Sequence, residues 1–321
     1  MRIGVVTPAY NVAPYIGDTI ASLIAQSHAD WALFVVDDGS TDATADVVAG
    51  FVDPRIRLLC QANAGVSAAR NRGIAALDDG VDAVLFLDGD DRLAPDALKR
   101  LAAALDGTLG AVAAYGAYAY VTEDGGRVTE TRAGPFPAGD ILERLLERNL
   151  FANGGHILIR RGAVTKAGDF SAGIAYGEDW EYWTRIALAG PFAVVPGALP
   201  LLMVRQRAGG ASLRMANDSA MFEPCMTAIF GNPELARRFG AAGLARIRLR
   251  TEAENTWIVG RELIRHRRGR EGLARLRRSV FAKPGPKRLG LLVVAHILDV
   301  LPDIWPAGLR GPFRCYDAPL K

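Results

Sequence analysis

Hydrophobic positions in the first hundred residues fall into short runs separated by helical patterns. Four runs are rich in Val, Ile and Leu. They lack the alternation of apolar and polar residues that marks a strand with one solvent-exposed face, so each is expected to be covered on both faces. These runs are Ile3–Val6, Ala32–Val36, Ile56–Cys60 and Ala83–Leu87. Buried parallel strands of this kind are typical of α/β proteins.

Helix candidates lie between the predicted strands. Apolar residues recur at helical spacing from Ile16 to Ile24, and Pro14 stands near the first turn, where proline is tolerated. The same spacing predicts helices at 44–52, 66–77 and 95–105. Strands that alternate with helices predict a mainly parallel, doubly wound sheet, and ligands bind such sheets beyond the carboxyl ends of the strands. The loops that follow the four strands are therefore expected to hold the chemistry.

The pattern changes further along the chain. Strand-like and helical segments continue to alternate up to about residue 195, and from about Asn217 the pattern is helical almost throughout. We therefore predict one half of an α/β domain at residues 1–110, a second half at 111–215 and a helical C-terminal extension at 216–321.

Charge is distributed unevenly along the chain. The formal net charge is +3, but Arg246–Arg288 holds fourteen Lys and Arg residues and four Glu, a net of +10, which leaves −7 for the rest. In this basic region Leu273, Leu276 and Val280 share one helical face, and the apolar segment Leu289–Leu301 that follows is too short to span a bilayer. The pattern indicates an anionic membrane surface as a partner. A packed helical extension or a homodimer contact explains it equally well.

Three carboxylates crowd the end of the fourth predicted strand, in the segment Phe86-Leu87-Asp88-Gly89-Asp90-Asp91. Like charges this close raise each other's pKa unless a positive group intervenes. A hard divalent cation with oxygen ligands suits such a cluster, and it would also neutralise a departing diphosphate. The alternative is a solvated turn in which Asp91 caps a helix.

Polar residues follow other strand ends and helix starts. Asp38 is placed to accept hydrogen bonds from a nucleobase or a ribose, although helix capping by Ser40 or Asp42 also explains its loop. Arg70 lies one turn into a helix that a glycine precedes, where it could meet a phosphate or lie in solvent. Asp179, in the first turn of another helix, could accept a proton from an attacking hydroxyl or simply favour the helix dipole.

Together these segments resemble family 2 glycosyltransferases, which have the GT-A fold. TPAYN, VVDDGSTDAT, NAGVSAARNRG, FLDGDD and GEDWEYWTRIA occur in the family's order over residues 1–215. The resemblance implies an α/β GT-A domain with a Rossmann-like nucleotide-binding half, an acceptor-binding half and a mainly parallel central sheet. It also implies an inverting transfer of a sugar from a nucleotide diphosphate donor, with UDP as the expected nucleotide, to an acceptor hydroxyl.

The resemblance also implies roles for individual residues. Asp179 is implied to be the catalytic base, and Asp88 and Asp90 to form a DxD motif that binds Mn²⁺ or Mg²⁺, with Asp90 as the direct ligand and Asp88 also near the ribose. Glu178, Trp180 and His156 are the expected acceptor-binding residues, although a core position for Trp180 and a structural role for His156 are simpler explanations. The expected donor-binding residues are Pro8, Ala9, Tyr10, Asp38, Arg70, Asp88, Arg205 and Arg207.

The sequence departs from the family pattern at Val204-Arg205-Gln206-Arg207, where many relatives have Tyr-Arg-x-His. The missing histidine argues against a nitrogen ligand for the metal, and Arg205 or Arg207 could pair with the diphosphate instead. The Gln-x-x-Arg-Trp signature of processive polysaccharide synthases is absent. A non-processive, single-addition enzyme is therefore expected.

Two other classes of function compete with this interpretation. A nucleotidyltransferase needs a similar sheet and metal but usually begins with a Gly-rich basic loop, which residues 1–15 lack. A non-catalytic sugar-nucleotide or glycan-binding protein would not need Asp88, Asp90 and Asp179 together.

The expected partners are a nucleotide-sugar donor and a glycan or lipid-linked acceptor of bacterial surface-polysaccharide assembly. No nucleic-acid-binding motif is recognised, so no nucleic acid is expected. Three scattered cysteines and the lack of a signal-peptide pattern predict a cytoplasmic protein, peripheral on the inner face of the plasma membrane if the basic region binds lipid.

Overall fold

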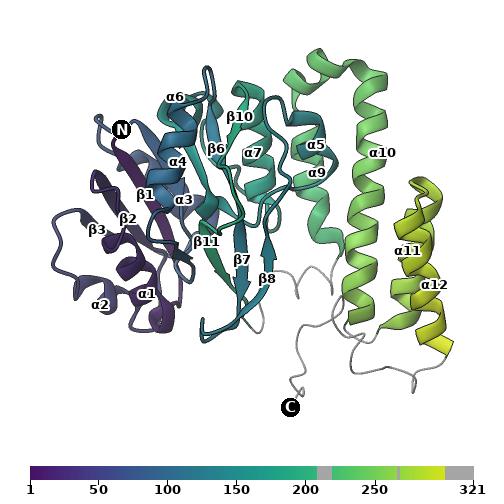
Figure 1. Ribbon diagram of the computed structural model, residues 1–321, viewed down its shortest axis with the longest axis horizontal. Helices are drawn as coiled ribbons and strands as arrows, with labels where there is room; N and C mark the ends of the chain where they lie inside the picture. The colour runs from purple at the N-terminus through teal and green to yellow at the C-terminus, as the bar shows by residue number, and fades with distance from the viewer. Residues whose placement is uncertain (208–218, 266–267, 301–321) are drawn as a thin grey trace. The chain divides into compact units, whose positions relative to one another are not determined.

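The computed structural model describes residues 1–207, 219–265 and 268–300 of the 321-residue chain. It divides into two compact units (Figure 1). The first comprises residues 1–142 and 149–207, and the second comprises residues 143–148 and the chain from residue 208 onward. The predicted boundary at residue 215 lies outside the described residues.

A seven-stranded sheet forms the centre of the first unit, in the order β10-β6-β9-β4-β1-β2-β3. Neighbouring strands are parallel except at β9, which runs antiparallel to β4 and β6. The mainly parallel α/β sheet that the sequence predicts is therefore confirmed. The strands are β1 (Ile3–Ala9), β2 (Trp31–Asp37), β3 (Ile56–Cys60), β4 (Ala83–Phe86), β6 (Ala113–Tyr115), β9 (Ile157–Arg160) and β10 (Phe192–Val194).

The parallel register brings the loops after the first strands to one edge of this sheet. Ala9, the last residue of β1, is opposite Asp37 of β2, and Asp37 is opposite Cys60 of β3. β4 is in register with β1 up to Phe86, so the loop with the three aspartates, Asp88–Asp91, begins at the same edge; we call it the acidic loop. The helices that follow these strands are α1 (Ala13–Ile24), α2 (Thr44–Ala49), α3 (Val66–Ala75) and α4 (Ala97–Asp106).

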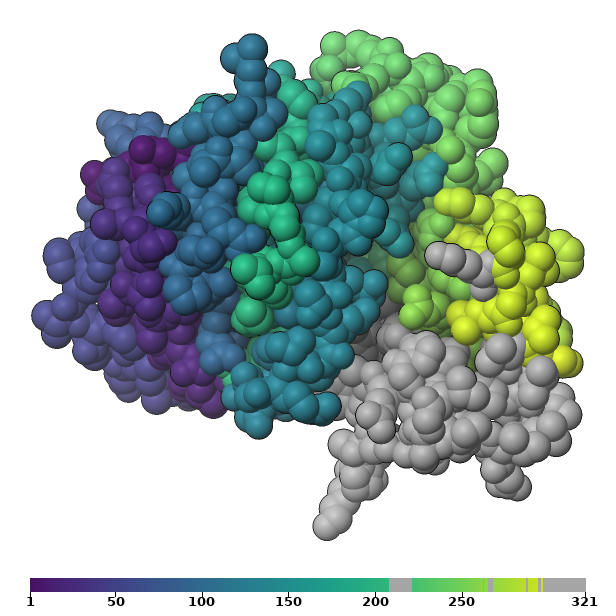
Figure 2. All heavy atoms as spheres, viewed as in Figure 1, coloured from purple at the N-terminus to yellow at the C-terminus, as the bar shows by residue number. Residues whose placement is uncertain are grey.

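A second sheet of four strands, in the order β5-β11-β7-β8, completes the first unit (Figure 1; Figure 2 draws all heavy atoms in the same view). β6 of the first sheet and β7 of the second are separated by Gly116 and Ala117, and a Cβ on Gly116 would lie 2.9 Å from Leu201 and from Val195. β11 pairs with β5, which directly follows the acidic loop. The strands are β5 (Arg92–Leu93), β7 (Tyr118–Val121), β8 (Val128–Arg132) and β11 (Leu202–Arg205).

Aromatic packing fixes the helix α7 (Glu178–Ala189) against β4. The rings of Phe170 and Tyr182 are stacked with centroids 3.8 Å apart, and Phe86 of β4 meets Phe170 edge to face at 5.1 Å. α7 begins after Gly177, whose φ of 82° lies in the left-handed region that glycine adopts without strain. The start of α7 is thus held near the end of β4. The first unit also contains the short helices η1 (Gly154–His156) and α6 (Arg161–Ala167).

The second unit is helical. α10 and α11 cross closely, since a Cβ on Gly260 would lie 3.0 Å from the carbonyl oxygen of Gly272. Its elements are α5 (Leu142–Glu147) from Glu143 onward, η2 (Ser219–Phe222), α9 (Glu223–Phe230), α10 (Pro233–Arg265), α11 (Gly269–Ala282) and α12 (Pro286–Val300). None of the helices in the described ranges combines the length and the apolar character that a transmembrane span requires.

The apolar face that the sequence offers to a membrane lies inside the second unit. Leu273, Leu276 and Val280 are buried, and the first two pack with Trp257 and Ile264 of α10. The expectation that this particular face meets a lipid surface is therefore wrong. Packing within the second unit already removes these three side chains from water, so they have almost no exposed apolar area left for a membrane.

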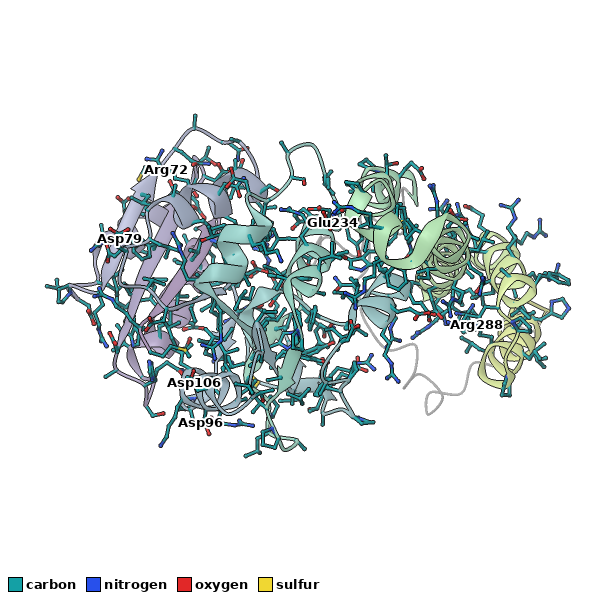
Figure 3. The ribbon with its side chains drawn as sticks, turned by 90° about the horizontal axis from the view of Figure 1, so that it is seen from above. Arg72, Asp79, Asp96, Asp106, Glu234 and Arg288 are labelled. Atoms are coloured by element: carbon teal, nitrogen blue, oxygen red, sulfur yellow. The ribbon has the colours of Figure 1, made fainter. Side chains whose placement is uncertain are left out.

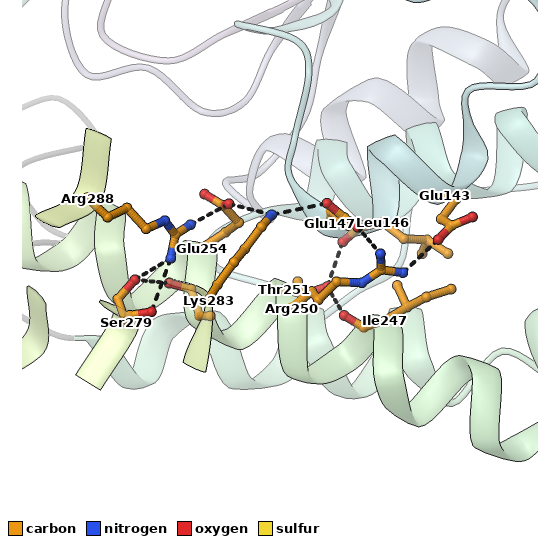
Figure 4. A network of polar contacts seen from close by, with 11 residues as sticks. Glu143, Leu146, Glu147, Ile247, Arg250, Thr251, Glu254, Ser279, Lys283 and Arg288 are labelled. Carbon is orange, nitrogen blue, oxygen red and sulfur yellow. Dashed lines mark hydrogen bonds and ion pairs between the residues drawn. The ribbon is translucent and has the colours of Figure 1, made fainter. Parts of the chain in front are cut away.

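Several basic residues of the second unit are paired internally (Figure 4). Arg250 forms ion pairs with Glu143 at 2.6 Å and Glu147 at 2.8 Å. Lys283 bridges Glu147 and Glu254 at 3.2 and 2.9 Å, and Arg288 also pairs with Glu254. Arg250, Lys283 and Arg288 are therefore paired within the second unit.

Candidate active site

Side chains of the loop after β2 cap the helix that follows β1. Asn11 donates its backbone N–H to Ser40 Oγ at 3.0 Å and accepts the N–H of Thr41 at 2.8 Å. Asp42 accepts the N–H of Ala13 at 3.1 Å, at the start of α1. These hydrogen bonds tie the first two loops together. Asp42 also accepts the N–H of Thr44 at 3.0 Å, at the start of α2, but the N-cap residue of α2 is Ala43, so neither Ser40 nor Asp42 is the N-cap that the sequence leaves open.

Asp38 is buried and organises the loop that precedes α3. Its carboxylate accepts hydrogen bonds from Gln61 Nε2 at 2.7 Å and from the backbone N–H groups of Ala64 at 2.9 Å and Gly65 at 2.8 Å. Of the three residues predicted at the end of β1, Tyr10 alone is exposed; Pro8 is partly exposed and Ala9 is buried. These four residues lie at the carboxyl edge of the sheet.

Arg70 is a buried cation between the acidic loop and α7. Its Nη2 donates to Asp88 Oδ1 at 3.0 Å, and its Nη1 donates to Glu178 Oε1 at 2.9 Å. Burial opposes the charge, but Asp88, Glu178 and Asp179 outweigh it and raise the pKa of Arg70. Arg70 therefore stays charged and joins segments 108 residues apart. Arg72, on the same helix, is exposed instead (Figure 3).

The three aspartates of the acidic loop have different surroundings. Asp88 and Asp90 are partly exposed. Asp91 is buried, accepting the backbone N–H of Arg205 at 2.8 Å and Nδ2 of Asn153 at 2.6 Å. Burial and the charges of Asp90 and Asp88 raise the pKa of Asp91 well above its usual range. Asp91 thus fastens the loop to β11, a role that the sequence did not indicate.

Arg205 and Arg207 differ in accessibility. The side chain of Arg205 is 3% exposed and that of Arg207 33%. Arg205 pairs with Asp18 at 3.0 Å and donates to the backbone oxygens of Asp90 and Glu123. Arg207 forms an ion pair with Asp90 at 2.8 Å. The contacts of Arg205 therefore lie within the fold, and Arg207 is the more accessible of the two arginines. Asp18 lies on a helix face with no motif, so no sequence signal marked it.

Asp179 stands at the start of α7 beside Glu178, and its Oδ1 accepts the N–H of Trp180 at 2.6 Å. Burial and the charge of Glu178 raise the pKa of Asp179 to about 7, while Arg70 opposes this shift. A carboxylate whose pKa lies near neutrality is suited to accept a proton at physiological pH.

Trp180 and His156 lie in the interior. Trp180 is buried, and His156 is fully buried, with Nδ1 donating to the carbonyl of Gly116 at 2.9 Å and Nε2 accepting the N–H of Ala152 at 3.3 Å. Burial lowers the pKa of His156 to about 4, so the imidazole is neutral. These positions favour the structural interpretation of both residues, and we do not carry them into the function proposed below.

Asp88 and Asp90 provide a donor set that fits a divalent cation. Both supply carboxylate oxygens, which Mg²⁺ and Mn²⁺ prefer. Burial and the charge of Asp88 raise the pKa of Asp90, against the effect of Arg207, so a cation would relieve unfavourable charge. The described part of the chain contains no cluster of three or more His, Cys, Asp or Glu residues placed to hold a metal. Two carboxylates would leave the remaining coordination positions to diphosphate and water oxygens, as is usual for Mg²⁺.

The sequence matches the model of the family described as "Glycosyl transferase family 2" over residues 4–168, about half of the chain. The succinoglycan biosynthesis protein ExoO of Rhizobium meliloti (strain 1021) is 32% identical over 252 residues, which cover 75% of this chain and 69% of ExoO. The chain therefore belongs to glycosyl transferase family 2.

Other similarities are more local or concern the fold alone. TuaG of Bacillus subtilis (strain 168), named for teichuronic acid biosynthesis, is 38% identical over 101 residues, which cover 30% of this chain and 39% of TuaG. The crystal structure of S. aureus TarS 1-349 in complex with UDP-GlcNAc has a TM-score of 0.65 at 18% identity, covering 94% of this chain and 88% of that one. The likeness to TarS shows the fold and confirms the GT-A architecture that the sequence predicts.

Proposed function

We propose that this protein is an inverting, non-processive glycosyltransferase. It moves a sugar from a nucleoside diphosphate donor, with UDP as the nucleotide, to a hydroxyl of a glycan or lipid-linked acceptor in bacterial surface-polysaccharide assembly. The observation that carries the proposal is the link from Asp88 through Arg70 to Glu178, because it holds Asp179 close to the acidic loop. A base with a pKa near 7 thus stands beside a site suited to a diphosphate.

The donor binds at the carboxyl edge of the seven-stranded sheet in this proposal. The exposed Tyr10 and the loop ordered by Asp38 contact the nucleoside, and Arg207 turns from Asp90 to the diphosphate. Asp88 and Asp90 would hold a divalent cation, which would offset the negative charge of the leaving diphosphate. Arg207 would offset the same negative charge by donating a charge-assisted hydrogen bond to the diphosphate.

Asp179 acts on the acceptor. Its carboxylate takes the proton of the acceptor hydroxyl as the oxygen attacks the anomeric carbon from the face opposite the diphosphate. One glycosidic bond forms, the bond from the anomeric carbon to the diphosphate oxygen breaks, and the nucleoside diphosphate departs. A single displacement inverts the anomeric configuration, and no enzyme nucleophile is required.

The names of similar proteins support the choice of substrate class. TuaG and ExoO are named for the biosynthesis of teichuronic acid and succinoglycan, and TarS was solved with UDP-GlcNAc. A polysaccharide or its lipid-linked precursor is thus the acceptor class that we propose, with the enzyme at the inner face of the plasma membrane.

The experiment is a product analysis with a panel of UDP-sugars, Mn²⁺ and glycan acceptors. We expect release of UDP, and NMR of the product should show an inverted anomeric configuration. Donor binding without UDP release would identify a binding protein. Formation of a nucleotide sugar from a nucleoside triphosphate and a sugar phosphate, with release of pyrophosphate, would identify a nucleotidyltransferase.

A further inference from the structure

The outward sides of α11 and α12 expose large apolar side chains. Phe281 is 89% exposed, Val293 57% and Leu289 49%. Phe281 lies in the last turn of α11. Leu289 and Val293 are four residues apart on α12, so these two share a face of that helix. Exposed apolar side chains that share one face, unlike scattered ones, call for an explanation.

Cations accompany these apolar side chains. Arg270, Arg277 and Phe281 are spaced by seven and four residues along α11, so they lie on one side of the helix, where they border the buried stripe that contains Leu273. Arg270 and Arg277 form no ion pair within the described ranges, unlike the arginines and the lysine of Figure 4.

One contact joins the two helices on this side. Arg277 Nη2 lies 3.5 Å from His296 Nδ1, and His296 follows Val293 by three residues on the same side of α12. We define the basic apolar face as Arg270, Arg277, Phe281, Leu289, Val293 and His296. It lies entirely within the second unit.

We propose that the basic apolar face docks the protein on an anionic lipid bilayer. Helices that lie in the plane of a membrane insert apolar side chains at the level of the headgroups, while arginines pair with lipid phosphates. The face supplies both parts, and its charge complements an anionic surface. A symmetric contact between two copies would instead bring Arg270 and Arg277 of each copy towards like charges.

Docking would hold the enzyme at the surface where lipid-linked acceptors reside. Docking thus adds a membrane partner to the proposed function, and binding to vesicles can be measured without any glycosyl transfer. A failure of docking and a failure of glycosyl transfer are therefore distinguishable.

The test is co-sedimentation of the full chain with vesicles of phosphatidylcholine that contain phosphatidylglycerol, and with vesicles of phosphatidylcholine alone. We expect binding to the anionic vesicles that weakens as salt is raised. Arg277→Glu should reduce the partition coefficient by about 25-fold, since each unit of charge near such a surface changes it about fivefold. Phe281→Ser should reduce it by about tenfold through lost apolar burial.

Two substitutions in the first unit serve as matched controls. Arg72→Glu reverses an exposed arginine, and Leu109→Ser removes a fully exposed apolar side chain. Both should bind vesicles as the wild type does, and all four variants should keep the wild-type melting temperature. Absence of wild-type binding, or equal binding by Arg277→Glu, Phe281→Ser and the controls, would overturn the proposal. So would a dimer in sedimentation velocity that Phe281→Ser dissociates while vesicle binding is unaffected.

Discussion

Replacement of Arg70 by methionine tests the link between the acidic loop and α7. The substitution keeps much of the volume but leaves Asp88 and Glu178 without their shared cation. Breaking a buried ion pair by removing one partner costs about 3–5 kcal/mol. Because Asp88 and Glu178 keep partial contact with solvent, we expect a smaller loss of unfolding free energy, roughly 2–4 kcal/mol.

The same substitution should change the pH dependence of turnover. Arg70 lowers the pKa of Asp179, while burial and Glu178 raise it. Loss of the cation therefore raises this pKa further, and a base is active only when it is deprotonated. The acidic limb of the rate profile should move to higher pH, so that the variant loses most activity below neutrality and recovers part of it at alkaline pH.

Urea unfolding and a pH–rate profile measure these two effects separately. Arg70→Lys keeps the charge but not the two-pronged geometry, so it should lose stability with a smaller shift of the acidic limb. Arg72→Met, on the exposed side of α3, is the matched control and should change neither. The reasoning fails if the acidic limb of Arg70→Met coincides with that of the wild type, or if its stability equals that of Arg72→Met.

Three further predictions concern the acidic loop and its neighbours. Asp90→Ala should remain folded, by thermal melting, yet lose Mn²⁺-dependent donor binding and turnover; full activity of this variant in EDTA would exclude Asp90 as a ligand. Arg207→Ala should raise the KM for the donor about tenfold with little loss of stability. Arg205→Ala should destabilise the fold by about 3 kcal/mol, because the Arg205 side chain forms an ion pair inside the first unit. Equal melting temperatures for the two variants would contradict this distinction. Gly154→Ala should destabilise the protein by about 1–3 kcal/mol in urea unfolding, since its Cβ would lie 2.7 Å from Phe86, and a neutral effect would show that the turn can relax.

The fold of the first unit was largely predictable because its signals are local. The apolar runs at β1, β2 and β4 have no polar alternation, and each becomes a strand buried along its whole length or nearly so. The expectation that the run at β3 is covered on both faces is wrong, because β3 is an edge strand and is only partly buried. That β6 and β7 belong to different sheets, although only two residues separate them, was not predictable, since β6 pairs with β9 and β7 with β11, which are remote along the chain. Pairings of this kind arise from tertiary packing, which no local pattern encodes.

In the candidate site, too, local signals were predictable from the sequence and tertiary contacts were not. The crowding of Asp88, Asp90 and Asp91 is visible in the sequence, but their different surroundings come from Arg70, Arg205 and Asn153, which are remote along the chain. Periodicity likewise marks an apolar face on α11 without saying what covers it. Leu273 and Leu276 meet α10, and the exposed basic apolar face that borders them could be recognised only in the structure.

The central claim is that Asp179 is the base of a glycosyl transfer, and one comparison tests it most directly. Asp179→Asn keeps the shape of the side chain and removes its basicity, and Asp169→Asn, at an exposed aspartate before α7, is the matched control. In single-turnover experiments with donor and acceptor, Asp179→Asn should be slower than the wild type by about 10²–10⁴. Its donor affinity should be unchanged, and Asp169→Asn should react at the wild-type rate. Turnover by Asp179→Asn within about threefold of the wild type would contradict the account and leave Asp179 as a residue that only stabilises the start of the helix.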